Sequence, residues 1–301
     1  MRVHHLNCIS TCPLGGRLTD GFSDCLLCRA RLSCHCLLVE TSAGLVLVDT
    51  GLGLRDVRDP RGRLSAFFLT LLSPDFREHM TAVRQVQALG HRPEDVRHIV
   101  LTHLDFDHAG GLDDFPRATI HLLRGERDYA RMQRTWLDRQ RFRPQQWSSQ
   151  ARWQTYEALS GERWFGFDCV RQLEGLPPEI LLVPLPGHTF GHVGVAVWYG
   201  PRWLLLAGDA YFHHEEMDAQ HPWCPPGLRL YQTLMEKSRT ARLLNQSRLR
   251  ALRSEHGRDV VICCSHAMPE FEALSNAHEH PGLPPLAAAS TAHAASRRAL
   301  P

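Results

Sequence analysis

The sequence predicts an α/β fold, because short apolar segments with the length of buried strands alternate with segments of helical periodicity. Residues 35–49, HCLLVETSAGLVLVD, are expected to form two strands around a Ser-Ala-Gly turn. A helix-like pattern follows in residues 79–95, and residues 97–101 then have the length and composition of a buried strand. The chain has 301 residues, 43% of them hydrophobic, which is ample for a large core.

A second block of strands is expected in the C-terminal half, in residues 180–185, 193–198, 203–207 and 259–264. Residues 126–176, between the two blocks, are less regular and rich in aromatic side chains, and we interpret them as an insertion near the mouth of the functional site. From residue 276 onward the composition turns to Ala, Pro, Ser and His without periodicity. We therefore predict one domain over residues 1–275 and a disordered tail over residues 276–301.

Composition excludes several classes of partner. The net charge is only +2 and the arginines are spread along the chain, which argues against a nucleic-acid or membrane surface. The N-terminus lacks the apolar run of a signal peptide, and no window reaches the roughly 18 apolar residues of a membrane span. We therefore expect a cytoplasmic protein whose ten cysteines are thiols rather than a disulfide framework.

Four cysteines near the N-terminus allow two interpretations. Cys25, Cys28, Cys34 and Cys36 have spacings that a structural zinc ion can use. Cys34 and Cys36 enter an expected strand two residues apart, so their side chains share one face. The alternative is that these cysteines pack as small apolar residues. The pattern leaves both interpretations open.

Potential metal ligands are concentrated in residues 102–111, THLDFDHAGG. His103, Asp105 and Asp107 alternate with apolar residues, and His108 follows directly. The two glycines that come next allow the backbone to pass close to a bound ion. Imidazole and carboxylate ligands together suit zinc, iron or manganese.

Three further candidate ligands stand just past the ends of expected strands. His188, Asp209 and His266 each follow one of these strands by two or three residues, and His103 has the same placement after residues 97–101. Parallel strands deliver such residues to one edge of a sheet, where open α/β folds place their functional sites. The sequence therefore predicts a metal centre at this edge.

The motifs resemble those of the metallo-β-lactamase superfamily. HLDFDH is similar to the HxHxDH motif of that family, and the resemblance extends from residue 35 to about residue 270. Its other matching segments are VDTG at 48–51, GHTFGH at 187–192, GDA at 208–210 and SH at 265–266. The resemblance implies a four-layer αββα sandwich and a metal-dependent hydrolase.

The resemblance also implies two divalent metal ions, with zinc first and iron or manganese as alternatives. The implied ligands of the first ion are His103, Asp105 and His188, those of the second are Asp107, His108 and His266, and Asp209 bridges the two. Asp49 is expected to hold ligands in place, and His192 to support or pack beside them. The family usually has histidine where this chain has Asp105, and we expect the carboxylate to bind the first ion directly and to harden that position.

The function implied is hydrolysis of a lactone or carboxylic ester by a hydroxide held between the two ions. Asp107 and Asp209 are candidate catalytic residues, and Asp107 is suited to shuttle a proton. The lactonase branch that acts on acyl-homoserine lactones is the most similar; it has a tyrosine three residues after the bridging aspartate. Here Tyr211 comes two residues after it and is a further catalytic candidate.

The substrate implied is a small molecule, apolar or acylated. Three alternatives stay open: a phosphoester or thioester hydrolase of the same fold, an iron-dependent redox enzyme of the same fold, and a relative that binds ligands without catalysis. The complete ligand set argues against the last of these.

Overall fold

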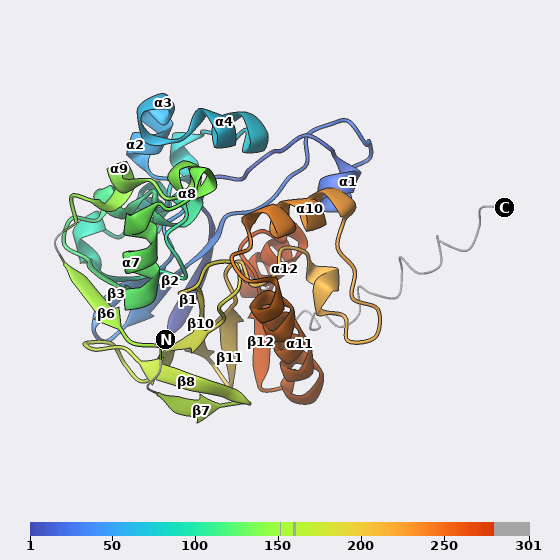
Figure 1. Cartoon of the computed structure of the whole chain (residues 1–301). Helices are drawn as coiled ribbons and strands as arrows, with labels where there is room; N and C mark the ends of the chain where they lie inside the picture. Colours follow the sequence, from blue (N-terminus) through green and yellow to red (C-terminus); the bar gives the residue numbers. More distant parts are fainter. Residues whose placement is uncertain (151, 159–160, 280–301) are drawn as a thin grey trace.

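The computed structural model describes residues 1–150, 152–158 and 161–279, and folds them into two mixed sheets that pack face to face with helices outside (Figure 1). The α/β class and the four-layer αββα arrangement are therefore confirmed. The first sheet has the strand order β1 (Arg2–Asn7), β2 (His35–Thr41), β3 (Gly44–Val48), β4 (Val96–Val100), β5 (Thr119–Leu123) and β6 (Trp153–Tyr156). The second has the order β12 (Val260–Cys263), β11 (Arg202–Leu206), β10 (Val193–Tyr199), β9 (Ile180–Pro184), β8 (Phe167–Gln172) and β7 (Glu162–Trp164).

The direction of the strands decides where the functional loops lie. Strands β3, β4, β5 and β6 run parallel, while β1, β2 and β3 pair antiparallel. In the second sheet β11 and β12 are parallel, and β10 pairs antiparallel with both β9 and β11. The strands β9, β11 and β12 therefore all point the same way, and their carboxyl ends meet at one edge.

The helices that cover the sheets come from both halves of the chain. Over the first half they are α1 (Arg17–Asp20), α2 (Leu54–Arg58), α3 (Pro60–Arg63), α4 (Ala66–Leu72), α5 (Ala82–Ala88), α6 (Phe106–Ala109), α7 (Arg124–Met132), α8 (Trp136–Arg141) and α9 (Pro144–Trp147). Over the second they are α10 (Pro226–Met235), α11 (Arg239–His256) and α12 (Met268–Glu279). Short 3-10 segments lie at Glu78–Met80, Pro93–Asp95, Leu112–Asp114 and His214–Met217.

The apolar core is layered because the strands are buried on both faces. In β3, Leu45 and Leu47 pack in the cluster beneath the helices, whereas Val46 and Val48 pack in the cluster between the sheets. Leu182 and Val195 of the second sheet join that central cluster. Strands covered on both sides have almost continuous apolar sequences, which is why residues 35–49 could be recognised without a polar alternation.

The helix expected over residues 79–95 is interrupted. A 3-10 turn at Glu78–Met80 precedes α5, and a second one at Pro93–Asp95 leads into β4. Gly90 has a φ of 87°, a left-handed conformation that ends the helical stretch.

The segment 126–176, which we interpreted as an insertion near the site, contributes strands to both sheets. It carries the chain from the first sheet to the second, because β6 pairs with β5 and β8 pairs with β9. Its aromatic residues are divided between two cores: Trp147 packs with the first sheet and its helices, and Phe167 packs with the second sheet.

The tail that the sequence predicts begins at residue 276. Helix α12 continues to Glu279, so residues 276–279 are helical, while residues 280–301 lie outside the described residues. Among the described residues, no helix is long and apolar enough to cross a membrane.

The cysteines divide into two groups. A disulfide joins Cys25 and Cys28, which corrects the expectation that every cysteine is a thiol. Cys34 and Cys36 are buried thiols, and Cys34 Sγ donates a hydrogen bond to the backbone oxygen of Asp107 at 3.0 Å. The groups of side chains that can hold a metal ion, within the part of the chain that is described, contain no cysteine. The structure therefore favours the packing interpretation for Cys34 and Cys36.

Helix α12 is attached to the second sheet through a buried carboxyl group. Glu270 accepts hydrogen bonds from the Tyr211 hydroxyl at 3.0 Å and from the backbone nitrogen of Cys264 at 2.9 Å. Burial raises the pKa of Glu270 from 4.5 to about 7, although these two donors and the charge of Arg253 oppose the shift.

This raised pKa predicts a dependence of stability on pH. The folded state binds the Glu270 proton more tightly than the unfolded state, so its contribution is complete below pH 4.5 and is lost as the pH rises through about 7. Glu270→Gln cannot ionise. Relative to this variant, the wild-type free energy of unfolding should fall by on the order of 2–3 kcal/mol between about pH 5 and about pH 8. Urea unfolding at both pH values measures it, with the exposed Glu255→Gln as control. The same change in the free energy of unfolding with pH in wild type and Glu270→Gln would show that Glu270 does not have a raised pKa.

Candidate metal centre

The predicted ligands come together at the shared edge of the two sheets. His103 follows β4, and Asp105, Asp107 and His108 lie on the loop and first turn that lead through α6. The remaining ligands, His188, Asp209 and His266, follow β9, β11 and β12. All of them are buried, with exposures of at most 5%.

The side chains form overlapping groups whose ligand atoms lie within 4.8 Å of one another: His103 with Asp105 and His188, His103 with His108 and Asp209, and Asp107 with His108 and His266. Asp209 Oδ2 lies 3.4 Å from His188 Nε2, and its Oδ1 lies 3.2 Å from His266 Nε2. Asp209 thus lies between His188 and His266. The three groups overlap through His103 and His108, and each could hold a metal ion.

An observation of the chain itself supports metal binding. His103 Nε2, His108 Nε2 and Asp209 Oδ1 are buried yet have no hydrogen-bond partner. Buried polar atoms without partners are costly, and native proteins rarely keep them unless an ion or water completes the site. Imidazole nitrogens with a carboxylate oxygen are the ligands that divalent zinc, iron and manganese accept.

Asp49 orients the ligand loop. Its Oδ2 accepts hydrogen bonds from His108 Nδ1 at 2.8 Å and from Thr102 Oγ1 at 2.7 Å, and its Oδ1 accepts one from the Thr102 backbone nitrogen at 2.8 Å. His103 Nδ1 in turn lies 2.9 Å from Thr102 Oγ1, to which it can donate. Because both Nδ1 atoms are engaged, the two Nε2 atoms are left free to face the cluster. Asp49 has a φ of 56°, a left-handed conformation that aspartate tolerates better than most residues.

The later ligands are held in a similar way. His266 Nδ1 donates to the backbone oxygen of Ser33 at 2.8 Å. His192 donates through Nδ1 to the backbone oxygen of Leu185 and accepts through Nε2 from the backbone nitrogen of Asp209, both at 2.9 Å. With both ring nitrogens used, His192 supports Asp209 rather than a metal ion.

Opposite charges govern the ionisation of the cluster. Burial alone would lower the pKa of His108, but the carboxylates of Asp209 and Asp49 outweigh it and hold that pKa well above the ordinary value. Burial would raise the pKa of Asp209, but the imidazoles around it, His266 first, hold it well below the ordinary value. The carboxylate is therefore the charged form that a cation would meet.

Arg141, which the sequence did not reveal, lies inside this cluster. Its Nε and Nη2 donate to the two carboxylate oxygens of Asp105 at 2.7 and 2.5 Å, and its side chain is fully buried. The charge of Arg141 overcomes the effect of burial and holds the pKa of Asp105 well below the ordinary value. The carboxylate at position 105 was a signal that a cation lies nearby, but with 34 Lys and Arg residues the sequence could not say which.

Glu126, on α7, is a second residue that sequence analysis missed. It accepts hydrogen bonds from the backbone nitrogens of Leu104 at 3.0 Å and Gly191 at 3.2 Å, and from Thr189 Oγ1 at 2.6 Å. Burial raises its pKa to about 7. Glu126 therefore ties the loop after β4 to the loop after β9, and sets the spacing between their ligands.

The tyrosine beside the cluster is Tyr231 of α10 rather than Tyr211. The Tyr211 hydroxyl is buried against Glu270, away from the ligands. The ring of Tyr231 lies 5.8 Å from that of Phe212, which stacks on His266, and burial together with the charges of Asp107, Asp105 and Asp209 raises the pKa of Tyr231 well above its ordinary value. The position of Tyr231 along the sequence did not indicate that it lies beside the ligands.

Phe212 lies against the cluster on another side. Its ring stacks on His266, with ring centroids 5.0 Å apart and an angle of 16° between the planes, and lies 5.7 Å from the ring of His188. The edge-on ring of Tyr231 is 5.8 Å from Phe212. Together these two rings form an aromatic border to the centre.

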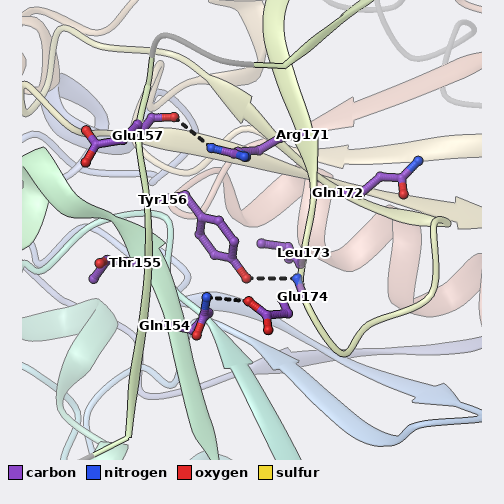
Figure 2. A pocket seen from close by; sticks show the side chains of 8 residues that line it. All are labelled: Gln154, Thr155, Tyr156, Glu157, Arg171, Gln172, Leu173 and Glu174. Carbon is purple, nitrogen blue, oxygen red and sulfur yellow. Dashed lines mark hydrogen bonds between the residues drawn. The ribbon is translucent and has the colours of Figure 1, made fainter.

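Figure 2 shows an open pocket of about 560 Å³ elsewhere, between β6 and the end of β8. Its walls are held together by the Tyr156 hydroxyl, which accepts from the backbone nitrogen of Glu174 at 3.0 Å, and by Gln154, which donates to the Glu174 carboxylate at 2.7 Å. None of the predicted ligands lines this pocket, so it is separate from the metal centre.

Known proteins match this chain over most of its length. A family model described as the metallo-β-lactamase superfamily matches residues 29–249. A protein named probable metallo-hydrolase from Mycobacterium tuberculosis is 40% identical over 266 residues, which are 88% of this chain and 80% of that protein. An N-acyl homoserine lactonase from Bacillus cereus is 28% identical over 189 residues, which are 62% of this chain and 68% of that protein.

The fold also matches a solved structure. An N-acyl homoserine lactone hydrolase with the product N-hexanoyl-L-homoserine bound at its catalytic metal center superposes with a TM-score of 0.66 and 21% identity. The match covers 90% of this chain and 94% of that one. These matches and the ligand cluster show that the chain belongs to the metallo-β-lactamase superfamily and is one of its metallo-hydrolases.

Proposed function

We propose that this protein hydrolyses a lactone or a carboxylic ester of a small, apolar or acylated molecule. The observation that carries the proposal is the buried cluster of four histidines and three aspartates, whose side chains form groups that could hold a metal ion. The likeness to lactonases in sequence and fold supports the choice of substrate class. Zinc is the first candidate for the metal, with iron and manganese as alternatives.

Divalent ions held by these ligands would lower the pKa of bound water and polarise the carbonyl group of the substrate. The chain itself supplies the handling of the proton. Burial raises the pKa of Asp107, against the opposing effect of His108 and His266. Its Oδ2 lies 3.8 Å from His266 Nε2, at the inner surface of the centre. A carboxylate at this place is suited to accept a proton and pass it to a leaving oxygen.

Tyr231 and Phe212 complete the substrate side of the centre. A phenol is protonated at neutral pH, so the Tyr231 hydroxyl can donate a hydrogen bond to an oxygen of the substrate. The ring of Phe212 offers an apolar surface to an acyl group. No observation favours the redox alternative, because Arg141 already neutralises the carboxylate of Asp105, the feature that suggested a harder metal.

Loss of a ligand from the second position should remove both metal and activity. We expect His108→Ala and His266→Ala to lower turnover by more than about 100-fold, because supporting residues alone change metal affinity or activity by about 10–100-fold. Turnover and metal content by mass spectrometry are the measurements, with the exposed His221→Ala as control. Full metal content and full activity in His266→Ala would show that the ligand assignment is wrong.

The two tyrosines should behave differently. Tyr231→Phe should lower kcat by roughly tenfold, since a hydrogen bond to the reacting substrate is worth about 1.5 kcal/mol. Tyr211→Phe should leave kcat near the wild-type value and lower only stability, because that hydroxyl contacts Glu270. Steady-state kinetics on one ester substrate compares them. A large loss in Tyr211→Phe with none in Tyr231→Phe would reverse our assignment.

Substrate class is tested by a panel. We expect N-acyl homoserine lactones or simple carboxylic esters to have a higher kcat/KM than thioesters, phosphodiesters or a β-lactam. The same preparation, with measured metal content, is used throughout, so differences reflect the substrate. A clear preference for phosphodiesters or thioesters would replace this proposal with one of the alternative hydrolase functions.

A further inference from the structure

The guanidinium of Arg141 occupies the side of the cluster where the first metal position lies. Besides its two bonds to Asp105, its Nη2 lies 2.8 Å from His188 Nε2. Asp105 and His188 are two of the three side chains that would bind the first ion, and His188 Nε2 is itself only 3.0 Å from Asp105 Oδ2. One nitrogen of Arg141 is thus in contact with both ligand atoms.

The hydrogen bond between Arg141 and His188 prevents His188 Nε2 from binding a metal ion. A guanidinium can only donate, so His188 Nε2 must accept from Arg141. A neutral imidazole has one lone pair on that nitrogen, and the lone pair cannot serve the guanidinium and a metal ion at the same time. Each oxygen of Asp105 also accepts one hydrogen bond from Arg141, which neutralises the carboxylate but leaves a second lone pair on each oxygen. Of the first group, only His103 Nε2 is left without a partner.

The surroundings hold Arg141 firmly in this place. Its Nη1 donates to the backbone oxygen of Met235 at 2.6 Å, and the guanidinium carbon lies 5.2 Å from the ring centroid of Phe142. The backbone of Phe142 pairs with that of Asp105 in an isolated antiparallel bridge, so the segment carrying Arg141 and the ligand loop move together. Moving the guanidinium would leave buried acceptors without a donor, which is costly.

The second metal position, at Asp107, His108, His266 and Asp209, does not contain the Arg141 guanidinium. His108 Nε2 and Asp209 Oδ1 have no hydrogen-bond partner, and the side chains around them are the ligands Asp107 and His266. The two metal positions therefore differ. At the first, the Arg141 guanidinium already binds the ligand atoms of Asp105 and His188. At the second, only an added ion can bind the ligand atoms that have no partner.

We propose that Arg141 stands in for the first metal ion, so that the protein binds one divalent ion tightly at Asp107, His108, His266 and Asp209. A second ion enters the group of His103, Asp105 and His188 only when the guanidinium is withdrawn. This inference rests on the metal centre of the proposed function but not on the identity of the substrate. Arg141 acts here as a positioning residue: it neutralises the first position and so determines how many metal ions the protein binds. It does not bind substrate, because nearly all its N–H groups already donate to the protein.

The test is metal stoichiometry, measured without any substrate. The full-length protein is stripped with a chelator and titrated with Zn²⁺ under equilibrium dialysis, and bound metal is counted by mass spectrometry. We expect one equivalent to bind tightly to the wild type. The second should bind about a hundredfold more weakly, because it must break a buried ion pair. Two equivalents of equal affinity in the wild type would overturn the proposal.

Variants identify the cause. Arg141→Met, which keeps an unbranched apolar side chain but removes the charged guanidinium, should bind two equivalents tightly. Since this change leaves Asp105 unpaired, Asp105→His combined with Arg141→Met serves as the second variant, and it should also bind two. One equivalent in this double variant, folded by circular dichroism, would overturn the proposal.

Arg63→Met is the matched control, because Arg63 is also buried and forms a 2.9 Å ion pair with Asp56, outside the ligand cluster. It should lose stability yet still bind one equivalent. A gain of a second tight equivalent in this control would also count against Arg141. If lactones and esters proved to be poor substrates, the number of bound zinc equivalents would not change, so the two proposals can be contradicted independently.

Discussion

The whole centre depends on how the charges of three buried carboxylates are balanced. Asp105, Asp107 and Asp209 lie side by side where water is largely excluded, and isolated charges in such a place are strongly disfavoured. Histidines approach Asp209 from three strand ends, while Arg141 takes both oxygens of Asp105. Asp107 Oδ2 is 3.8 Å from His266 Nε2, which is too far for a hydrogen bond, and burial raises the pKa of Asp107. The demand for an added cation is therefore concentrated on the side of the centre that contains Asp107.

The fold serves this balance by bringing loops from both sheets to one edge. Asp49 at the end of β3 orients His108, and Glu126 on α7 binds the loops after β4 and β9 at once. His192 supports the backbone of Asp209 across the second sheet. The spacing of the ligands is therefore set by the packing of the two sheets against each other, so the apolar layer between them is part of the functional machinery.

Much of this was predictable, for an identifiable reason. Ligands that follow apolar strands are marked by local sequence, so the seven candidates could be chosen without the structure. The roles of Arg141, Glu126 and Tyr231 arise from helices that pack across the centre, and no local pattern records such contacts. The same limit explains why the strands within residues 126–176 were not foreseen, because strands of three to six residues with mixed composition carry too weak a signal. Tyr211 was chosen by its distance along the chain from Asp209, and its side chain turns into the core instead.

The hydrogen bond from His266 to Ser33 joins residues that are 233 positions apart in the chain. His266 is the last ligand to leave the ribosome, and its orientation depends on a backbone oxygen near the beginning of the chain. The Ser33 hydroxyl also donates to the backbone oxygen of Ser265, so this closure involves two neighbouring links. The orientation of His266 is thus fixed only after residues 33–266 have been synthesised and both sheets have met. An ion that needs His266 as a ligand therefore cannot guide the folding of the first sheet while the second is still being synthesised.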